Sequence, residues 1–418
     1  MACTGYPGEA WGRRRVNPIN QSRKRMNLML EALAAQPADA LLGLIKLYNA
    51  DPRADKIDLG VGVYRTASGA TPVFAAIKSA EARLLETQDS KSYLGPDGDM
   101  GFVTALIPYV FGAEFDRARV DGMQAPGGTG AVRLAVEVAA RAGVKRVFMG
   151  TPSWPNHAQI IAASGLELVP FAHVTPEGTA DFAALVAALN TAGPGDAVLL
   201  HGCCHNPSGV DYTGQQWDAI APLLAQRKVL PLLDLAYQGL GEGMEADAYG
   251  LRTVLAAVPE ALVAYSCDKN FGLYRDRVGA FYAVTGDAGA LTRAMANGAA
   301  IARASWSMPP DHGAAAVRLV LEDAALTAQW LNELDDMRAR IREVRDRLAA
   351  AQRVGSVPMA PVGNQNGLFS ILPLSPAQIL ALREDHGVYM AGSGRINIAG
   401  LTGDNIEPFL TALRAVTA

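Results

Sequence analysis

The feature that most limits the possible folds of this chain is a regular alternation, from about Val120 onward, of short apolar runs with longer amphipathic stretches. The apolar runs predict buried strands at residues 144–149, 166–171, 197–200, 229–233 and 261–265. The amphipathic stretches between them predict helices, for example at residues 131–142, 182–190 and 215–226. Strands that alternate with helices form a largely parallel sheet with helices on both faces. We therefore predict an α/β fold whose chemistry lies at the carboxyl ends of the strands.

The remainder of the chain predicts a second, smaller α+β domain. A long charged amphipathic helix is expected at residues 326–353, followed by strand-like or mixed segments at 368–372, 384–390 and 395–399. Residues 41–71 precede the alternating body and are expected to return to this C-terminal part. We predict a large domain over residues 73–335, a small domain made of 38–72 and 336–418, and an N-terminal tail over 1–37.

Composition excludes several classes of protein. The 418 residues are 50% hydrophobic and 19% charged, a globular balance, and the net charge of −4 indicates neither nucleic acid nor an anionic membrane as partner. An apolar stretch long enough for a transmembrane helix is not found. The four cysteines form no CxxC pair, which favours reduced thiols and a cytoplasmic location. The basic start of the chain is compatible with a transit peptide, but its prolines and glycines favour a disordered tail.

Reactive side chains follow three of the predicted strands. Asp234 ends one strand and Tyr237 follows three residues later. A second strand ends at Ser266, which is followed by Lys269 and Arg277, and a third is followed by Asn206 in a Pro/Gly turn. The carboxyl ends of parallel strands meet at one edge of the sheet. We therefore expect a carboxylate, a phenol, a lysine, an arginine and an amide to gather there.

This set of groups is the one that pyridoxal 5′-phosphate requires. A lysine that is poised near neutral pH forms a Schiff base with the aldehyde. A carboxylate keeps the ring nitrogen protonated, so that the ring can accept electrons, and a phenol and an amide bind the phenolic oxygen. Backbone amides, a hydroxyl and a guanidinium suit the phosphate.

Six sequence blocks carry a resemblance to a known family. They read, in chain order, GGTGA, PSWPNH, LLHGCCHNPSG, DLAYQG, SCDKNFGLYRDRVG and GRINIAG. In order and spacing they resemble the signature blocks of the class I aspartate/aromatic amino acid aminotransferases, and the similarity runs from about Ala38 to the C-terminus. The resemblance implies a fold type I pyridoxal-phosphate transferase, with a large domain built on a mainly parallel sheet and a smaller α+β domain.

The resemblance also implies roles at the cofactor ring. Lys269 would carry the cofactor and move the proton between the substrate α-carbon and the cofactor. Asp234 would pair with the pyridinium nitrogen, with His157 supporting Asp234. Tyr237 and Asn206 would bind the phenolic oxygen.

For the phosphate, the resemblance implies Gly128, Thr129, Ser266 and Arg277. Tyr93 would reach the phosphate bound by a neighbouring subunit. The active form implied is therefore a homodimer with shared active sites.

For the substrate, the resemblance implies that Arg395 clamps the α-carboxylate while Gly62 closes over it. Asn206 would also touch that carboxylate, and Trp154 would stack on the cofactor ring beside the substrate. Arg303 matches the arginine that binds a distal carboxylate across the dimer.

Two other motifs invite different interpretations. His201, Cys203, Cys204 and His205 lie within five residues, but adjacent side chains of an extended segment point in opposite directions and do not close a tetrahedral site, so we predict no metal. GGTGA lacks the spacing of a dinucleotide fingerprint, and we interpret it as a phosphate-binding helix start.

The chain departs from the family pattern at Asp268, where Ser or Ala is usual. A carboxylate that faced the cofactor would raise the pKa of the imine. Since neighbouring side chains in an extended segment diverge, we expect Asp268 to point away and to be solvated or paired with a residue such as Arg275.

The preferred substrate and the rival functions rest on fewer residues. Aspartate-preferring members usually have Asn where this chain has Met308, and an apolar Met308 favours an aromatic or dual-specificity enzyme over strict aspartate specificity. We predict transfer of the amino group to 2-oxoglutarate by a ping-pong mechanism. The alternatives are a β-lyase or decarboxylase of the same fold, and a regulator that has lost turnover, although residues 1–37 are too short for a winged helix.

Overall fold

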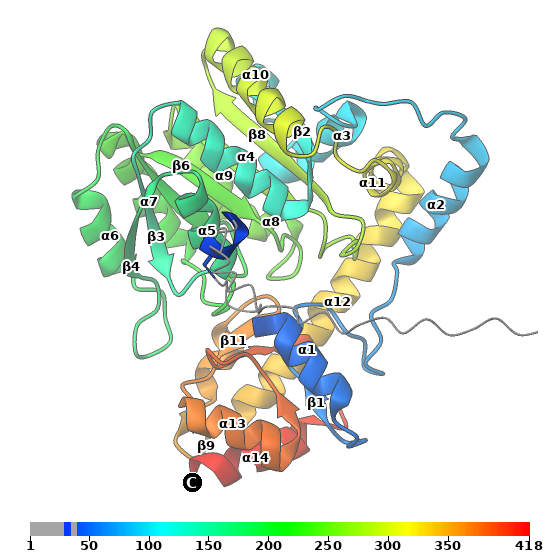
Figure 1. The fold of residues 1–418 in the computed structure, drawn as a ribbon, viewed down its shortest axis with the longest axis vertical. Coiled ribbons are helices and arrows are strands. Elements are labelled where there is room, and N and C mark those ends of the chain that lie inside the picture. Colours follow the sequence, from blue (N-terminus) through cyan, green and yellow to red (C-terminus); the bar gives the residue numbers. More distant parts are fainter. Residues whose placement is uncertain (1–28, 35–39) are drawn as a thin grey trace, which may run out of the picture. The chain divides into compact units, whose positions relative to one another are not determined.

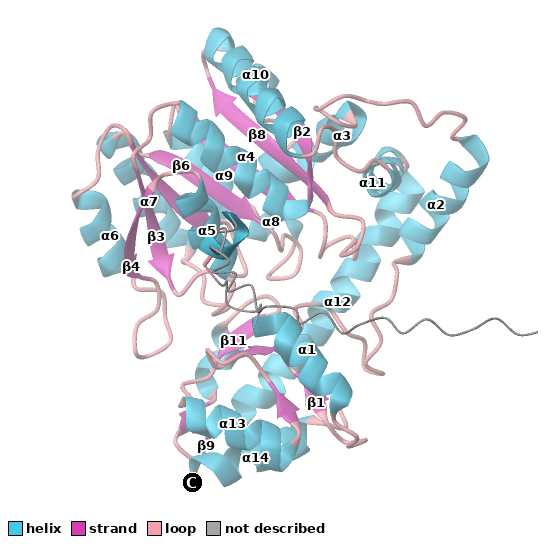
Figure 2. Cartoon of the chain, in the orientation of Figure 1, coloured by secondary structure: helices cyan, strands magenta, loops and turns pink. Residues whose placement is uncertain are grey.

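The computed structural model describes residues 29–34 and 40–418. Met29–Ala32 form a short 3-10 helix, η1, and the basic residues of the predicted tail lie outside the described residues. From Ala40 onward the chain forms one continuous unit that begins with helix α1, Ala40–Ala50. Figures 1 and 2 show this fold by sequence position and by secondary structure.

A seven-stranded sheet forms the centre of the fold. Its strands lie in the order β2-β8-β7-β6-β5-β3-β4. Their bounds are Val120–Pro126 (β2), Arg146–Thr151 (β3), Glu167–Ala172 (β4), Asp196–His201 (β5), Leu230–Leu235 (β6), Glu260–Ser266 (β7) and Val278–Thr285 (β8). β3 to β7 pair in parallel, whereas β8 is antiparallel to both of its neighbours. All five predicted strands are found, but β4 lies at the edge of the sheet and only its Phe171 is buried, so the expected burial is wrong for this strand. β2 and β8 are additions.

Helices cover both faces of this sheet. They are α4 (Gly127–Arg141), α5 (Pro155–Ala163), α6 (Phe182–Asn190), α7 (Gly214–Arg227), α8 (Met244–Asp247), α9 (Tyr249–Ala257) and α10 (Ala288–Ser305). Side chains alternate along β7, so that Leu262 and Ala264 join the core under α4 and α10, while Val263 and Tyr265 join the core under α7 and α9. Burial on both faces is the reason why inner strands such as β7 are almost continuously apolar. The predicted α/β fold is confirmed.

Further helices join the sheet to the C-terminal part. α2 (Ala75–Thr87), α3 (Met100–Phe111), α11 (His312–Glu322) and the 27-residue α12 (Ala324–Ala350) add buried side chains to the core under α7 and α9. The 3-10 helix η2 (Arg117–Arg119) precedes β2 and has no buried residue. Trp330 of α12 is fully buried, stacks on Phe271 at a centroid distance of 4.3 Å and donates to the carbonyl of Asn270. This contact fixes the long helix against the loop that contains Lys269.

Three two-stranded ladders occupy the smaller C-terminal part. β1 (Ile57–Asp58) pairs in parallel with β12 (Val388–Tyr389), so the early segment does return to the C-terminal part (Figure 1). β11 (Phe369–Ile371) pairs with β13 (Arg395–Asn397), and β9 (Arg353–Val354) pairs with β10 (Val357–Pro358). α13 (Pro376–His386), α14 (Ile406–Thr417) and the 3-10 helices η3 (Ala360–Asn364) and η4 (Ile398–Gly400) complete it. The predicted domain boundaries stay a prediction.

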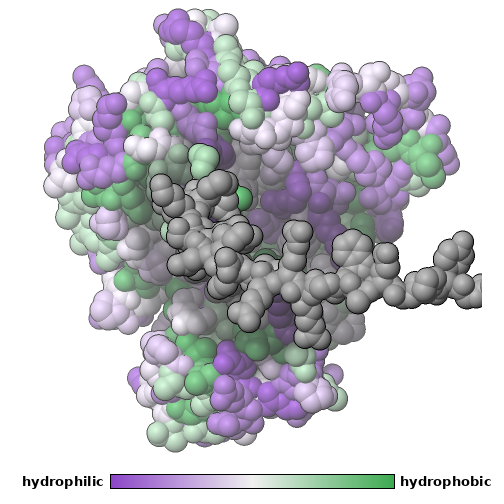
Figure 3. Space-filling view, viewed as in Figure 1, coloured by the Kyte–Doolittle hydropathy of each residue, from purple (hydrophilic) through white to green (hydrophobic). Residues whose placement is uncertain are grey.

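The surface is mixed in character. On the face shown in Figure 3, hydrophilic residues are interspersed with small hydrophobic areas. Within residues 29–34 and 40–418, none of the helices combines the length and the hydrophobicity that crossing a bilayer requires.

Candidate active site

The carboxylate of Asp234 lies at the carboxyl end of β6 and is held by a histidine. Its Oδ2 atom lies 2.9 Å from Nε2 of His157, a fully buried residue of α5. Nδ1 of His157 lies 3.0 Å from the hydroxyl of Ser153, which also contacts His201. Burial opposes ionisation of the carboxyl, but the hydrogen bond with His157 holds the pKa of Asp234 below its usual value. Asp234 is therefore an anion in the protein interior.

The other oxygen of Asp234 is free to receive a donor. Oδ1 is buried and has no hydrogen-bond partner among the described residues, and the same is true of Oδ1 of Asn206. Buried acceptors are nearly always paired in folded proteins. Two such atoms at one edge of the sheet indicate a ligand with complementary donors.

Lys269 lies in the turn that follows β7, close to the ring of Tyr237. Its Nζ atom is 5.2 Å from the centroid of that ring. Burial lowers the pKa of Lys269, while the charges of Asp268 and Asp234 oppose the shift. A lysine with a lowered pKa has more of the neutral, nucleophilic amine at neutral pH.

A phenol and an amide meet beside this lysine. Nδ2 of Asn206 donates to the hydroxyl of Tyr237 over 3.3 Å, and both residues are buried. Burial raises the pKa of Tyr237, so its phenol stays protonated and remains a hydrogen-bond donor. Trp154 caps the start of α5, and its ring meets His157 edge-on at 5.0 Å. The structure thus brings together Lys269, Asp234, His157, Tyr237, Asn206 and Trp154 as predicted from their sequence blocks.

The start of α4 forms a narrow cradle. A Cβ atom on Gly127 would lie 2.5 Å from Nη2 of Arg277, and one on Gly128 would lie 2.9 Å from Cβ of Ser266. Gly127 also has a φ of 68°, which favours glycine. Thr129 lies in the same first helical turn. The unpaired backbone amides of a helix start, together with a guanidinium and a hydroxyl, suit a phosphate.

Arg395, on β13, forms the opposite wall. Its guanidinium carbon lies 4.4 Å from the centroid of the Phe369 ring, and that ring lies 6.1 Å from the ring of Tyr237. Nη2 of Arg395 donates to the carbonyl of Gly60 over 2.8 Å, while Nε is buried without a partner among the described residues. Burial lowers the pKa of Arg395. An arginine with unused donors suits a carboxylate ligand.

Phe369 and Asn397, which the sequence did not single out, also shape this wall. A Cβ atom on Gly62 would lie 2.7 Å from Cζ of Phe369, so the loop at Gly62 closes directly on that ring. Asn397 donates to the carbonyls of Val61 and Val63 and holds the same loop. The GRIN block contains both Arg395 and Asn397, so the sequence held a signal for Asn397. Phe369 lies in none of the six sequence blocks, so nothing in the sequence pointed to it.

Tyr93 and Arg303 do not join the other predicted residues within one chain. Tyr93 is 93% exposed, and Arg303, near the end of α10, donates to the hydroxyl of Ser307 over 2.5 Å. The neighbouring amide of Leu94 lies 3.2 Å from the sulfur of Met308. The loop at Tyr93 therefore lies beside the segment that follows Arg303, on an open surface.

The expectation for Asp268 is wrong in its partner and its burial. Asp268 is 1% exposed, and its Oδ2 atom accepts from Nη1 of Arg277 over 2.5 Å. The expected partner, Arg275, is exposed. The chain turns directly after β7, so the alternation of an extended strand does not apply at this position.

Two further features use residues that are not in this set. Possible metal-ligand atoms of Cys203, Cys204 and Asp247 lie within 4.8 Å of one another. However, the hydrogen bond with Cys204, together with burial, raises the pKa of the Cys203 thiol. Burial also raises the pKa of the Cys204 thiol to about 12. Asp247 already accepts three backbone hydrogen bonds.

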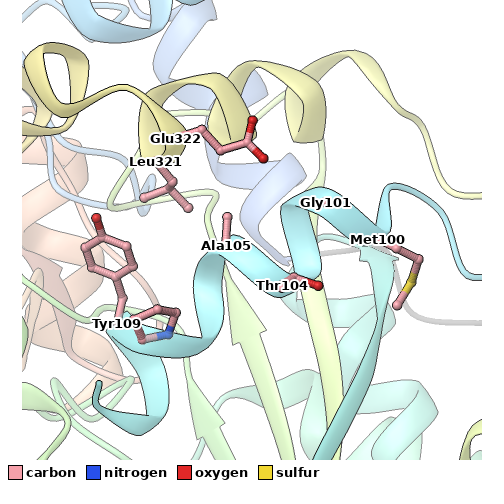
Figure 4. Close-up of a pocket in the computed structure, with 8 residues that line it drawn as sticks. Met100, Gly101, Thr104, Ala105, Tyr109, Leu321 and Glu322 are labelled. Carbon is pink, nitrogen blue, oxygen red and sulfur yellow. The ribbon is translucent and has the colours of Figure 1, made fainter. Parts of the chain in front are cut away.

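A hollow of about 630 Å³ lies between α3 and the end of α11 (Figure 4), lined mainly by apolar groups.

Comparison with known proteins identifies the family. Residues 54–413 match the family described as aminotransferase class I and II. This chain is a member of that family. It is 51% identical over 374 residues to a tyrosine aminotransferase of Rhizobium meliloti, covering 89% of this chain and 96% of the relative. It is 45% identical over 395 residues to an aspartate aminotransferase of Escherichia coli, covering 93% and 100%.

A solved structure agrees with this membership. The aromatic-amino-acid aminotransferase of Burkholderia pseudomallei, covalently bound to pyridoxal phosphate, superposes with a TM-score of 0.89 at 34% identity and covers 94% of this chain and 100% of its own. The predictions of a fold type I aminotransferase and of pyridoxal 5′-phosphate as its cofactor are confirmed. The β-lyase and decarboxylase alternatives are not favoured, and the substrates are amino acids and 2-oxo acids.

Proposed function

We propose that this aminotransferase moves the amino group of aromatic L-amino acids and of aspartate to 2-oxoglutarate by a ping-pong mechanism, as a homodimer with shared active sites. The observation that carries the proposal is the Asp234 carboxylate. It is buried, one oxygen is held by His157, and the other has no partner among the described residues. An anion in this state pairs with a protonated ring nitrogen and keeps it protonated.

Each catalytic side chain has a separate task. When bound, pyridoxal 5′-phosphate supplies an electron sink for the charge that develops at the substrate α-carbon. Lys269 would hold the cofactor through its Nζ atom, and once the substrate amino group has replaced it there, the freed neutral amine would take the proton from that carbon. The hydroxyl of Tyr237 and the amide of Asn206 would bind the phenolic oxygen, and Trp154 would lie against the ring.

Binding of the substrate α-carboxylate falls to Arg395. The guanidinium is fixed against Phe369 and Gly60 and retains donors for a bidentate pair. Gly62 lies against Phe369, so closure of this loop excludes water from the pair. The same clamp serves every amino acid, because all of them carry the α-carboxylate.

Discrimination between side chains falls to the segment that contains Arg303 and Met308. Arg303 is exposed within one chain, which suits a residue that completes the site of a second subunit. A distal carboxylate would pair with Arg303, whereas an aromatic ring would contact the thioether of Met308. Tyr93, 93% exposed beside this segment, suits contact with the phosphate bound by the other subunit.

A donor panel tests this proposal. Aspartate, glutamate, tyrosine, phenylalanine and an aliphatic donor are each assayed with 2-oxoglutarate, and kcat/KM is compared. We expect both aspartate and the aromatic donors to exceed the aliphatic donor by at least about tenfold, roughly 1.4 kcal/mol in transition-state binding. Activity with aspartate alone would contradict the dual specificity, and sedimentation of the holoenzyme as a monomer would contradict shared sites.

A further inference from the structure

The cradle at the start of α4 contains a carboxylate. Oδ2 of Asp268 accepts from Nη1 of Arg277 over 2.5 Å, and Oδ1 accepts from the amide of Val278 over 3.1 Å. The Asp268 side chain is 2% exposed. The Arg277 side chain is 41% exposed, so the pair joins a carboxylate that is fixed in the protein interior to a guanidinium that is open to solvent.

This carboxylate lies at the position proposed for the phosphate. A Cβ atom on Gly127 would be 2.8 Å from Oδ2 of Asp268 and 2.5 Å from Nη2 of Arg277. Both charged groups therefore approach the first residue of α4, whose backbone amides lack helical partners. A phosphate dianion bound by Arg277 at this helix start would lie within a few ångströms of the Asp268 charge.

The charges in the cradle act in opposite directions on such a ligand. Arg277 and the helix start attract the dianion. Asp268 repels it and neutralises Arg277, whose Nη1 atom is already used by Asp268 and by the carbonyl of Tyr274. Because Asp268 is buried, solvent screens this repulsion only weakly.

We propose that Asp268 sets the affinity for the cofactor phosphate, weakening it so that the phosphate contributes little to cofactor retention. The proposal rests on the proposed function, with the cradle at the start of α4 as the site of the cofactor phosphate. It makes Asp268 an affinity-determining residue that acts both directly and through Arg277. The consequence is a protein that loses and regains its cofactor readily during isolation and dialysis.

The test compares two ligands that differ only in the phosphate. Apoprotein is titrated with pyridoxal 5′-phosphate and with pyridoxal, and binding is followed by quenching of protein fluorescence. The variants are Asp268→Ser and the nearly isosteric Asp268→Asn, so that one of them remains usable if the other folds poorly. The matched control is Asp276→Asn, which removes the same charge from a residue whose side chain forms no hydrogen bond or ion pair within the described part of the chain.

Both Asp268 variants should bind pyridoxal 5′-phosphate at least about tenfold more tightly than the wild type, a difference of roughly 1.4 kcal/mol. Their affinity for pyridoxal should change by less than about threefold, and inorganic phosphate should compete more strongly in the variants. Asp276→Asn should behave as the wild type. Unchanged or weaker binding of the phosphorylated cofactor in both variants overturns the proposal, because Asp268 would then only orient Arg277.

Failure of the proposed function would appear elsewhere in the same experiment. It would be seen in the wild type alone, as absence of cofactor trapped on Lys269 by borohydride. Failure of the present inference would be seen in the variants, as affinity for pyridoxal 5′-phosphate equal to or weaker than that of the wild type, with trapping on Lys269 intact. An equal gain in affinity for pyridoxal would also overturn it, because the charge would then act on the ring or on Lys269.

Discussion

Nε2 of His157 lies 2.9 Å from Oδ2 of Asp234, and this contact joins α5 to the carboxyl end of β6 in a fully buried position. The other nitrogen of His157 is held by Ser153, so the orientation of the imidazole is fixed from both sides. The pair therefore maintains an ionised carboxylate in the interior with one oxygen still available. The first prediction concerns this carboxylate.

Replacing Asp234 with Ala should lower the half-transamination rate by about a thousandfold or more, roughly 4 kcal/mol, because the ring nitrogen loses the anion that keeps it protonated. Single-turnover measurements on cofactor-loaded protein check this. Asp196→Ala, which removes a buried carboxylate at the amino end of β5, is the control and should change the rate by less than about threefold. A loss below about tenfold for Asp234→Ala would show that Asp234 has only a structural role.

Lys269 is the predicted attachment site of the cofactor. Reduction with borohydride, followed by peptide mapping, should find the label on Lys269, and Lys269→Ala should abolish it because no other lysine of the described residues lies in the turn after β7. The exposed Lys145→Ala variant should label as the wild type does. Label on any other lysine would remove the basis of the assignment.

The charge of Asp268 should also act on Lys269. Burial lowers the pKa of this lysine and Asp268 opposes the shift, so Asp268→Ser should lower the pKa further and leave more neutral amine at neutral pH. The pH dependence of acylation of Lys269 in the apoprotein measures this, with the reaction of Lys269→Ala subtracted. An unchanged titration midpoint would mean that the Arg277 partner cancels the charge of Asp268 completely.

The two substrate arginines should differ in their effects. Arg395→Ala should lower kcat/KM for every donor by at least about a hundredfold, since all donors lose the α-carboxylate clamp. Arg303→Ala should damage aspartate and 2-oxoglutarate far more than tyrosine, because only dicarboxylates leave a second charge unpaired. Arg293→Ala, on the same helix and exposed, is the matched control. Equal losses for both kinds of donor would show that Arg303 does not contact the side chain.

Met308 should influence the preference between donors. Replacing it with Asn removes a thioether–ring contact worth about 0.3–1.5 kcal/mol, so the tyrosine-to-aspartate ratio of kcat/KM should fall by roughly two- to twelvefold. Met308→Leu keeps the apolar surface and should change the ratio less than Met308→Asn does. An identical ratio in all three proteins would place the ring elsewhere.

Local patterns in the sequence were sufficient for much of the fold and for the identity of the reactive groups. The five predicted strands and α12 followed from hydrophobic periodicity, because burial on one or both faces imposes that periodicity directly. β8 is also a continuous apolar run, but no helix separates it from β7, so the alternation of strands with helices did not predict it. β2 was not predicted because it contains Gly122 and ends in Pro126. The reactive residues lay in compact blocks whose spacing is set by strand–loop junctions.

Contacts between residues far apart in the chain were set by the folded structure. Arg395 donates to Gly60, and β1 pairs with β12; both contacts join segments more than 300 residues apart. Arg395 also lies over the ring of Phe369 on the adjoining strand β11, and no local pattern records the directions of these two side chains. The partner of Asp268 depended on the turn after β7, which directs its carboxylate to Arg277 and away from solvent. Periodicity reports which side of an element is buried, whereas the identity of a buried side chain's partner depends on the packing of the whole chain.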